Sequence, residues 1–234
     1  MKRIFVPTKT GTDWQHLLGK PKLHWKKGRS AMSAAACWEQ NQPLLPSEIT
    51  QVLEAGDDPA LSELQLLVAI PEWEVELPSG NNASQTDILA ITRNQSGLVI
   101  LGVEAKVDEP FGPTLEKKKT GATQDQLDRI AYLEKELGRT EPFGNHIRYQ
   151  LLHRTVSAIL TARAFHAHVA VMLVHSFSGS SKWRDDYEAF CQELGCTSLS
   201  EDLHEVPNIE GQRLILGWCN GNEKYLGVEL PSAL

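Results

Sequence analysis

The chain has 234 residues, of which 41% are hydrophobic and 23% are charged, and these proportions exclude a mostly disordered chain or a fibrous repeat. The net charge of -7 argues against a protein that coats nucleic acid through charge alone, but it allows an enzyme with a local basic surface. No apolar run is long enough to cross a bilayer, and the first residues lack the apolar stretch of a secretion signal, so we expect a cytoplasmic chain.

The first half of the chain predicts two helices followed by a group of strands. Ser30 is predicted to cap a helix through AMSAAACWEQ, and Ser47 a second helix through EITQVLEAG that Gly56 closes. The segments LQLLVAI and WEVEL indicate extended structure, and PSGNNAS indicates a loop. Two further strands, TDILAITR and LVILGVEAKV, are separated by NQSG.

The second half predicts helices that alternate with buried strands. After the loop DEPFGPTLEKKKTG, apolar residues recur at helical spacing in two stretches: Leu127, Ile130, Ala131 and Leu137, then Ile147, Leu151, Ile159 and Leu160. HVAVMLVHSF is typical of a strand buried on both faces, WRDDYEAFCQEL is helical, and RLILGWC is a last strand. We expect one α/β domain over 1–234, with a mixed sheet flanked by helices and a helical N-terminal extension over about 1–60.

Cysteines and histidines form no pattern typical of a metal site. The four cysteines include no paired CxxC motif and are few for a disulfide scaffold, so we expect reduced thiols and no zinc. Five histidines lie between His146 and His175, but His166 and His168 have no matching ligand pair, which favours structural or surface roles. The cysteines are Cys37, Cys191, Cys196 and Cys219.

Three charged side chains are predicted to meet across a hairpin. If NQSG is a four-residue hairpin loop, Arg93 pairs with Leu98, and Asp87 then lies directly opposite Glu104. Opposite residues of an antiparallel pair share a face, with Cβ atoms roughly 4.5–5.5 Å apart, and Lys106 projects from the same face as Glu104.

This arrangement favours a metal site over an unassisted acid pair. Two like charges among apolar neighbours destabilise the fold unless something compensates them, and a bound cation would do so. Carboxylate oxygens suit Mg²⁺, and Lys106 beside the metal can hold or help to deprotonate an attacking water. The alternative is a solvated ion pair, because Glu-x-Lys is also common at strand ends.

Asp, a spacer and then Glu-x-Lys across a β-hairpin resembles the signature of the PD-(D/E)XK nuclease superfamily. That superfamily has a restriction endonuclease-like αβββαβ core, which the predicted elements at 47–55, 64–77, 86–93, 98–107, 122–138 and 168–176 would supply in order. The segments HWKKGRSA, CWE, SQTDILAI and VEAKVDEPFG also look like a bacterial family placed in this superfamily, for which no substrate is named.

The resemblance implies a role for each motif residue. Asp87 and Glu104 would hold Mg²⁺ or Mn²⁺, and the backbone carbonyl of Ala105 would be a further ligand. Lys106 would position the attacking water. Thr86 stands where the motif has proline, which weakens the motif match more than the chemistry.

Other polar residues are candidates for a supporting role, and each has a plain structural alternative. Glu109 is a candidate for contact with a metal or sits at the start of a solvated loop. Gln126 and Arg129 either point at phosphate or form an exposed helix face. Some members of the superfamily use an acidic residue on the first helix, for which Glu39 and Glu54 are candidates.

Two basic segments are candidates for nucleic-acid contact. Lysine and arginine mixed with tryptophan suit phosphate contact and base stacking, although the tryptophan can equally plug the core and a lysine run can be a solvated loop. The residues are Trp25, Lys26, Lys27 and Arg29 in the first segment, and Lys117, Lys118 and Lys119 in the second.

The sequence therefore predicts a Mg²⁺- or Mn²⁺-dependent nuclease or nuclease-like phosphodiesterase that hydrolyses DNA. Its partner would be nucleic acid, and the resemblance allows a homodimer, because many such enzymes pair to cut two strands. The alternative is a catalytically inactive protein that uses the same fold to bind nucleic acid or another protein.

Overall fold

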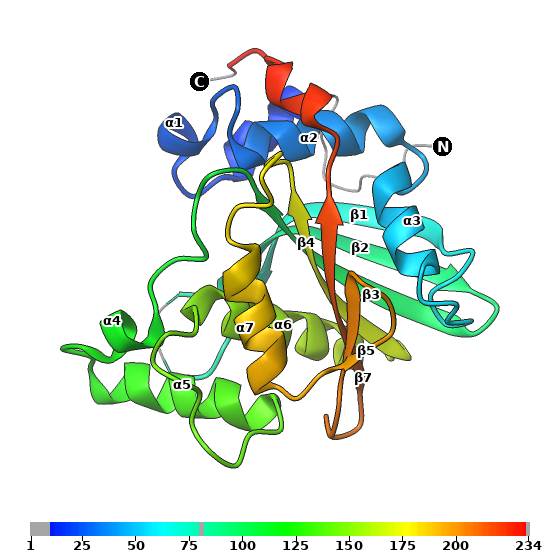
Figure 1. The fold of residues 1–234 in the computed structure, drawn as a ribbon. Coiled ribbons are helices and arrows are strands. Elements are labelled where there is room, and N and C mark those ends of the chain that lie inside the picture. Colours follow the sequence, from blue (N-terminus) through cyan, green and yellow to red (C-terminus); the bar gives the residue numbers. More distant parts are fainter. Residues whose placement is uncertain (1–9, 80–81, 233–234) are drawn as a thin grey trace.

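A seven-stranded mixed sheet forms the centre of the computed structural model, which describes residues 10–79 and 82–232 (Figure 1). The strand order is β1-β2-β3-β4-β7-β6-β5, in which β3 and β4, and β4 and β7, are parallel and all other neighbours are antiparallel. The strands are β1 Gln65–Val75, β2 Ser84–Asn94, β3 Gly97–Lys106, β4 Val169–Ser176, β5 Thr197–Ser198, β6 Leu203–Val206 and β7 Arg213–Asn220. The expected mixed α/β fold is confirmed.

Helices cover both faces of this sheet. One face carries the N-terminal elements and a C-terminal 3₁₀ helix, which Figure 1 shows beside each other: η1 Gly11–Leu17, α1 Pro21–His24, α2 Ser30–Asn41, α3 Ser47–Glu54 and η2 Glu223–Gly227. The other face carries α4 Leu115–Lys119, α5 Gln124–Glu136, α6 Tyr149–Ala164 and α7 Arg184–Glu193. No helix among the described residues is long and apolar enough to cross a membrane.

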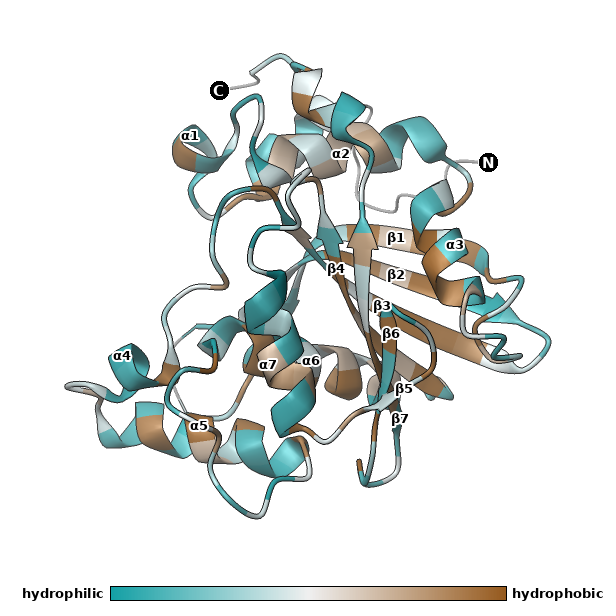
Figure 2. Ribbon diagram, in the orientation of Figure 1, coloured by the Kyte–Doolittle hydropathy of each residue, from teal (hydrophilic) through white to brown (hydrophobic). Residues whose placement is uncertain are grey.

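The central strands are apolar on both sides because each side packs against helices. All residues of β4 are buried, as the run HVAVMLVHSF predicts. Val171 and Leu173 pack into the core below the N-terminal helices, whereas Ala170 and Met172 pack into the core below α6. Figure 2 shows this distribution, with hydrophobic strands at the centre and hydrophilic outer surfaces on α5 and α7.

The hairpin of β2 and β3 has the predicted register but a shorter loop. Arg93 pairs with Leu98, as expected, and Asn94 also pairs with Gly97, so the loop holds two residues instead of four. The pairing of β2 with β3 ends at Ile88 and Val103, one pair before Asp87 and Glu104. From there β3 continues beside β4 to Lys106, while β2 stays beside β1. The two strands therefore form a fork with Asp87 on one branch and Glu104 on the other.

Several local predictions were wrong. Ser30 and Ser47 are the first residues of their helices and not the caps, and the Ser30 hydroxyl donates to Glu109 instead. The two extended segments do form one strand, β1, in agreement with the single element predicted at 64–77, and within it Glu72 has a left-handed backbone with φ of 53°. The loop expected after β3 contains the short helix α4.

The helix that packs on the sheet between β3 and β4 is α6, and not the helix predicted at 122–138. Helix α6 contacts β2, β3 and β4, while α5 packs outside it against α6. Close approach depends on small residues, since a Cβ added to Gly102 of β3 would lie 3.2 Å from the Cβ of Ala158. This packing brings the first turns of α6 to the fork.

Candidate active site

A cleft of about 1220 Å³ opens at the fork between β2 and β3. Strands β1, β2 and β3 and the first turns of α6 line it, together with residues of the N-terminal segment. More acidic than basic side chains line the cleft. The acids are Glu72, Glu74, Glu76, Asp87, Glu104 and Glu109, and the lysines and arginines are Lys20, Lys106, Arg129 and Arg154.

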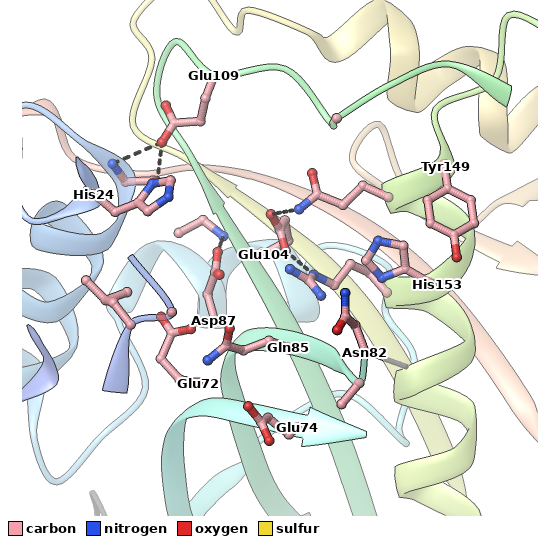
Figure 3. Close-up of a pocket in the computed structure, with 18 of the residues that line it drawn as sticks. His24, Glu72, Glu74, Asn82, Gln85, Asp87, Glu104, Glu109, Tyr149 and His153 are labelled. Carbon is pink, nitrogen blue, oxygen red and sulfur yellow. Dashed lines mark hydrogen bonds and ion pairs between the residues drawn. The ribbon is translucent and has the colours of Figure 1, made fainter. Parts of the chain in front are cut away.

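Three carboxylates lie side by side on three neighbouring strands. The pairs Pro71 with Ile88 and Trp73 with Thr86 place Glu72 of β1 across from Asp87 of β2. Figure 3 shows Glu72, Asp87 and Glu104 pointing into the cleft from adjacent strands. The left-handed backbone of Glu72 is an uncommon conformation for a residue other than glycine, and such conformations cluster at functional sites.

Asp87 uses only one of its two carboxylate oxygens in a hydrogen bond to the described residues. Its Oδ2 accepts a hydrogen bond of 2.7 Å from the backbone N–H of Ala105, which joins the two branches of the fork. Its Oδ1 accepts no hydrogen bond from the described residues. Burial, and next the charge of Glu104, raise the pKa of Asp87 from its ordinary 3.8 to about 7.

Glu104 is compensated by two cations of the protein itself. Its Oε1 lies 2.6 Å from the Lys106 ammonium, and its Oε2 lies 2.5 Å from Nε of Arg154. Burial alone would raise the pKa of Glu104, but Arg154 and Lys106 together lower it to about 2. Arg154, which the sequence analysis did not foresee, therefore helps to compensate Glu104 without a bound cation, whereas the pKa of Asp87 stays raised.

Lys106 lies at the floor of the cleft beside Glu104. Its ammonium donates to Glu104 Oε1 and, at 3.1 Å, to Oε1 of Gln150, and it stands 5.2 Å from the centre of the Phe111 ring. Its side chain is 5% exposed, so little of it reaches solvent.

Helix α6 contributes residues that the sequence analysis missed. Gln150 donates to Glu104 Oε1 at 2.7 Å, and Arg154 donates to Glu104 and to the Ser84 hydroxyl. His153 lies 2.8 Å from that hydroxyl, and burial and the charge of Arg154 hold its pKa well below 6.5. The available signal was a polar group at positions 150, 153 and 154 on the second of the helices predicted after β3, although that helix was not the one expected to pack on the sheet.

Glu72 was missed as well, although the alternation in PEWEVE places its acids on one face of a strand. Burial, followed by the charge of Asp87, raises the pKa of Glu72 to about 9. Near neutral pH the three acids on adjacent strands therefore differ: Glu72 is protonated, Asp87 is near its titration point, and Glu104 is a carboxylate.

The supporting candidates separate in the structure. Glu109 lines the cleft and accepts from the backbone N–H groups of Ser30 and Val107. Arg129 also lines it, but its guanidinium donates to three backbone carbonyls of the segment after β1. Three others lie outside the lining. Gln126 caps α5, Glu39 accepts from the indole N–H of Trp14, and the exposed Glu54 accepts from the backbone N–H of Glu63.

The two basic segments lie near the rims of the cleft. Trp25 is 6% exposed and donates to the carbonyl of Pro231, which is the core role weighed for it. Lys26, Lys27 and Arg29 are exposed outside the lining, whereas Lys20, which precedes this segment in the sequence, belongs to the lining. On the other side, Lys117 is exposed and Lys119 half-buried, and Lys118 packs 4.9 Å from the ring of Tyr149, a lining residue.

Comparison with known proteins gives a family without an assigned activity. The family model described as "Domain of unknown function (DUF6946)" matches residues 7–223, which is most of the chain. No curated protein matches the chain, and no solved structure does.

Proposed function

We propose that this chain, which belongs to the DUF6946 family, is a divalent-metal-dependent phosphodiesterase of the PD-(D/E)XK nuclease kind that hydrolyses DNA. The observation that carries the proposal is the fork: Asp87 and Glu104 face one cleft from two diverging strands, and the Lys106 ammonium lies 2.6 Å from Glu104.

The donor set fits a hard divalent cation. Asp87 Oδ1, Glu104 and the carbonyl of Ala105 would hold Mg²⁺ or Mn²⁺, since such ions prefer oxygen ligands and keep several waters. Asp87, with its pKa near 7, is poised to give up its proton when a cation arrives. When bound, the metal would supply Lewis-acid stabilisation of charge on a phosphoryl oxygen.

The residues of the chain have distinct parts in this proposal. Lys106 uses two ammonium protons on Glu104 and Gln150, and no further hydrogen-bond acceptor among the described residues engages it, so one N–H remains for a water or a phosphate oxygen. Arg154 keeps Glu104 ionised and in place. Glu72, as a protonated acid, can donate a hydrogen bond to a leaving oxygen.

Size and charge of the cleft support a polymeric phosphate substrate. Its volume exceeds the roughly 300–1,000 Å³ of ordinary small-molecule pockets. Basic residues near both rims can bind the phosphates on either side of the reacting phosphate. The acidic side chains between them would attract a metal ion to the centre of the cleft. Four free cysteines agree with a reducing compartment, so we propose that the enzyme acts in the cytoplasm. A homodimer would present two such clefts and could cut both strands of a DNA duplex.

One observation favours the alternative, a nuclease-like scaffold that binds nucleic acid or protein without cleaving. Both oxygens of Glu104 already accept hydrogen bonds from Lys106, Gln150 and Arg154. A carboxylate satisfied by its own protein needs no metal to be stable.

Cleavage assays separate the two functions. Supercoiled plasmid and single-stranded DNA or RNA are incubated with wild type, Lys106→Ala and the control Lys182→Ala, whose ammonium lies on the surface beside Asp108, with Mg²⁺ or Mn²⁺. The enzyme proposal expects cleavage by wild type and Lys182→Ala that EDTA and Lys106→Ala abolish. Binding without cleavage in every condition would leave the scaffold as the answer.

A further inference from the structure

A second group of metal-ligating side chains lies outside the cleft. Cys37 of α2, Glu48 of α3 and His175 of β4 each offer one ligand atom, and the three atoms lie within 4.8 Å of one another. Cys37 Sγ and His175 Nε2 are each 3.5 Å from Glu48 Oε1. Ligands about 2.0 and 2.3 Å from a tetrahedral zinc lie roughly 3.5 Å apart, so these two separations need almost no adjustment.

The environment of His175 indicates a bound metal independently of the distances between the three ligand atoms. His175 is fully buried, and neither ring nitrogen has a hydrogen-bond partner among the described residues. An imidazole sealed in a core without a partner costs free energy, and Nε2 points at the carboxylate from a distance that is too long for a good hydrogen bond. A metal ion between them would give Nε2 a partner.

The chemistry of the three ligands selects the metal. A thiolate, an imidazole and a carboxylate suit Zn²⁺, whereas Mg²⁺ avoids sulfur. With a neutral imidazole, the charges of the thiolate and the carboxylate cancel those of Zn²⁺, so the filled site buries no net charge. Cys219 of β7, which pairs with His175, is not among the ligand atoms that lie within 4.8 Å of one another, so a water would take the fourth position.

We infer that Cys37, Glu48 and His175 form a structural zinc site that ties α2 and α3 to the sheet. Figure 1 shows α2 above the carboxyl ends of β4 and β7, so a metal held by α2 and β4 would connect the N-terminal helices to this end of the sheet. His175 neighbours Ala105 in the sheet, while Glu104 faces the opposite core. Zinc would therefore hold the backbone behind the fork rigid without entering the cleft.

Asn41 gives the site an outer contact. Its side-chain amide donates to the carbonyl of Cys37 at 2.8 Å and to the hydroxyl of Tyr225 at 3.1 Å, so it links the helix that bears the thiol to η2. Contacts of this kind orient metal ligands and contribute to affinity. None of the cysteines stands in a paired motif, which is why the sequence argued against zinc: the ligands come from three separate elements.

Metal analysis of the full chain tests the site. Protein purified without chelator is expected to carry one zinc per chain by mass spectrometry of the metal, and millimolar Mg²⁺ should leave it in place. Cobalt added to metal-free protein should give a thiolate charge-transfer band, which only sulfur ligation produces. Zinc should also raise the thermal midpoint of the metal-free chain.

Variants locate the ion. Cys37→Ser and His175→Gln should lose zinc and the cobalt band, and Glu48→Gln should weaken zinc binding at least tenfold. Cys191→Ser, which changes a buried cysteine of the other core, and Asp87→Asn in the cleft should keep the zinc. The inference is overturned if folded wild type contains no zinc and gives no cobalt band, or if zinc persists in Cys37→Ser. If a variant fails to fold, the cobalt spectrum of the wild type decides whether a thiolate binds the metal.

Discussion

Replacing Asp87 by asparagine should stabilise the metal-free protein at pH 8 while abolishing its affinity for Mg²⁺. The fold raises the pKa of this carboxyl from 3.8 to about 7, and a difference of this size corresponds to about 4 kcal/mol at pH values where the buried group must ionise. Asparagine removes that charge and keeps an oxygen to accept from the N–H of Ala105. The expected gain is therefore at most about 4 kcal/mol.

The gain must depend on pH in one direction. Because the folded state holds the Asp87 proton more tightly than the unfolded chain, this residue costs nothing below about pH 4 and progressively destabilises the wild type up to about pH 7. The advantage of Asp87→Asn should thus be absent near pH 4, grow with pH and level off above 7.

Chemical denaturation in EDTA at a series of pH values measures this difference. Asp128→Asn is the matched control, since Asp128 is exposed on α5 and keeps its contact with Gln124, so its unfolding free energy should follow the wild type. Saturating Mn²⁺ should then stabilise wild type but not Asp87→Asn. A variant that is less stable than wild type at pH 8, or a gain that does not change with pH, would refute the electrostatic account.

Three further substitutions test the neighbours of Asp87. Arg154→Met should lower the unfolding free energy by about 3–5 kcal/mol at pH 7, because it leaves Glu104 buried with one cation fewer. The loss should shrink below about pH 4.5, where the unfolded carboxyl is protonated, and urea titrations that show no loss at pH 7 would contradict this reasoning. Glu72→Gln should stabilise the protein by up to about 3 kcal/mol at pH 7, because the unfolded carboxyl is ionised there while the folded state keeps Glu72 protonated. This gain should be absent near pH 4 and level off above the folded pKa of about 9, and denaturation curves that show no gain at pH 7 would contradict the raised pKa. Lys106→Met should reduce cleavage at least about 100-fold while calorimetry still detects Mn²⁺ binding, and loss of both would give Lys106 a structural role.

The fold was predictable where hydrophobic pattern and burial agree. Strand β4 and the register of β2 with β3 follow from the apolar run and from the turn between them. Helix starts were not predictable from serine alone, because Ser30 uses its hydroxyl on Glu109, a residue distant in the sequence. The choice between α5 and α6 as the helix on the sheet depended on the fit of Ala158 against Gly102, which sequence spacing does not reveal.

The site was predictable only within the hairpin. Asp87, Glu104 and Lys106 converge because strand periodicity and register bring them together, and these are local properties of the sequence. Arg154 and Glu72 come from elements whose position depends on tertiary packing. Since Arg154 sets the ionisation of Glu104, the electrostatics of the cleft could not be derived from the hairpin alone.

Anomalous scattering from crystals soaked in Mn²⁺ tests the central claim most directly. The account predicts a manganese peak within coordination distance of Asp87 Oδ1 and Glu104, present in wild type and absent in Asp87→Asn. A well-ordered cleft that shows no manganese at saturating concentration, with the ion pairs of Glu104 to Lys106 and Arg154 intact, would contradict it.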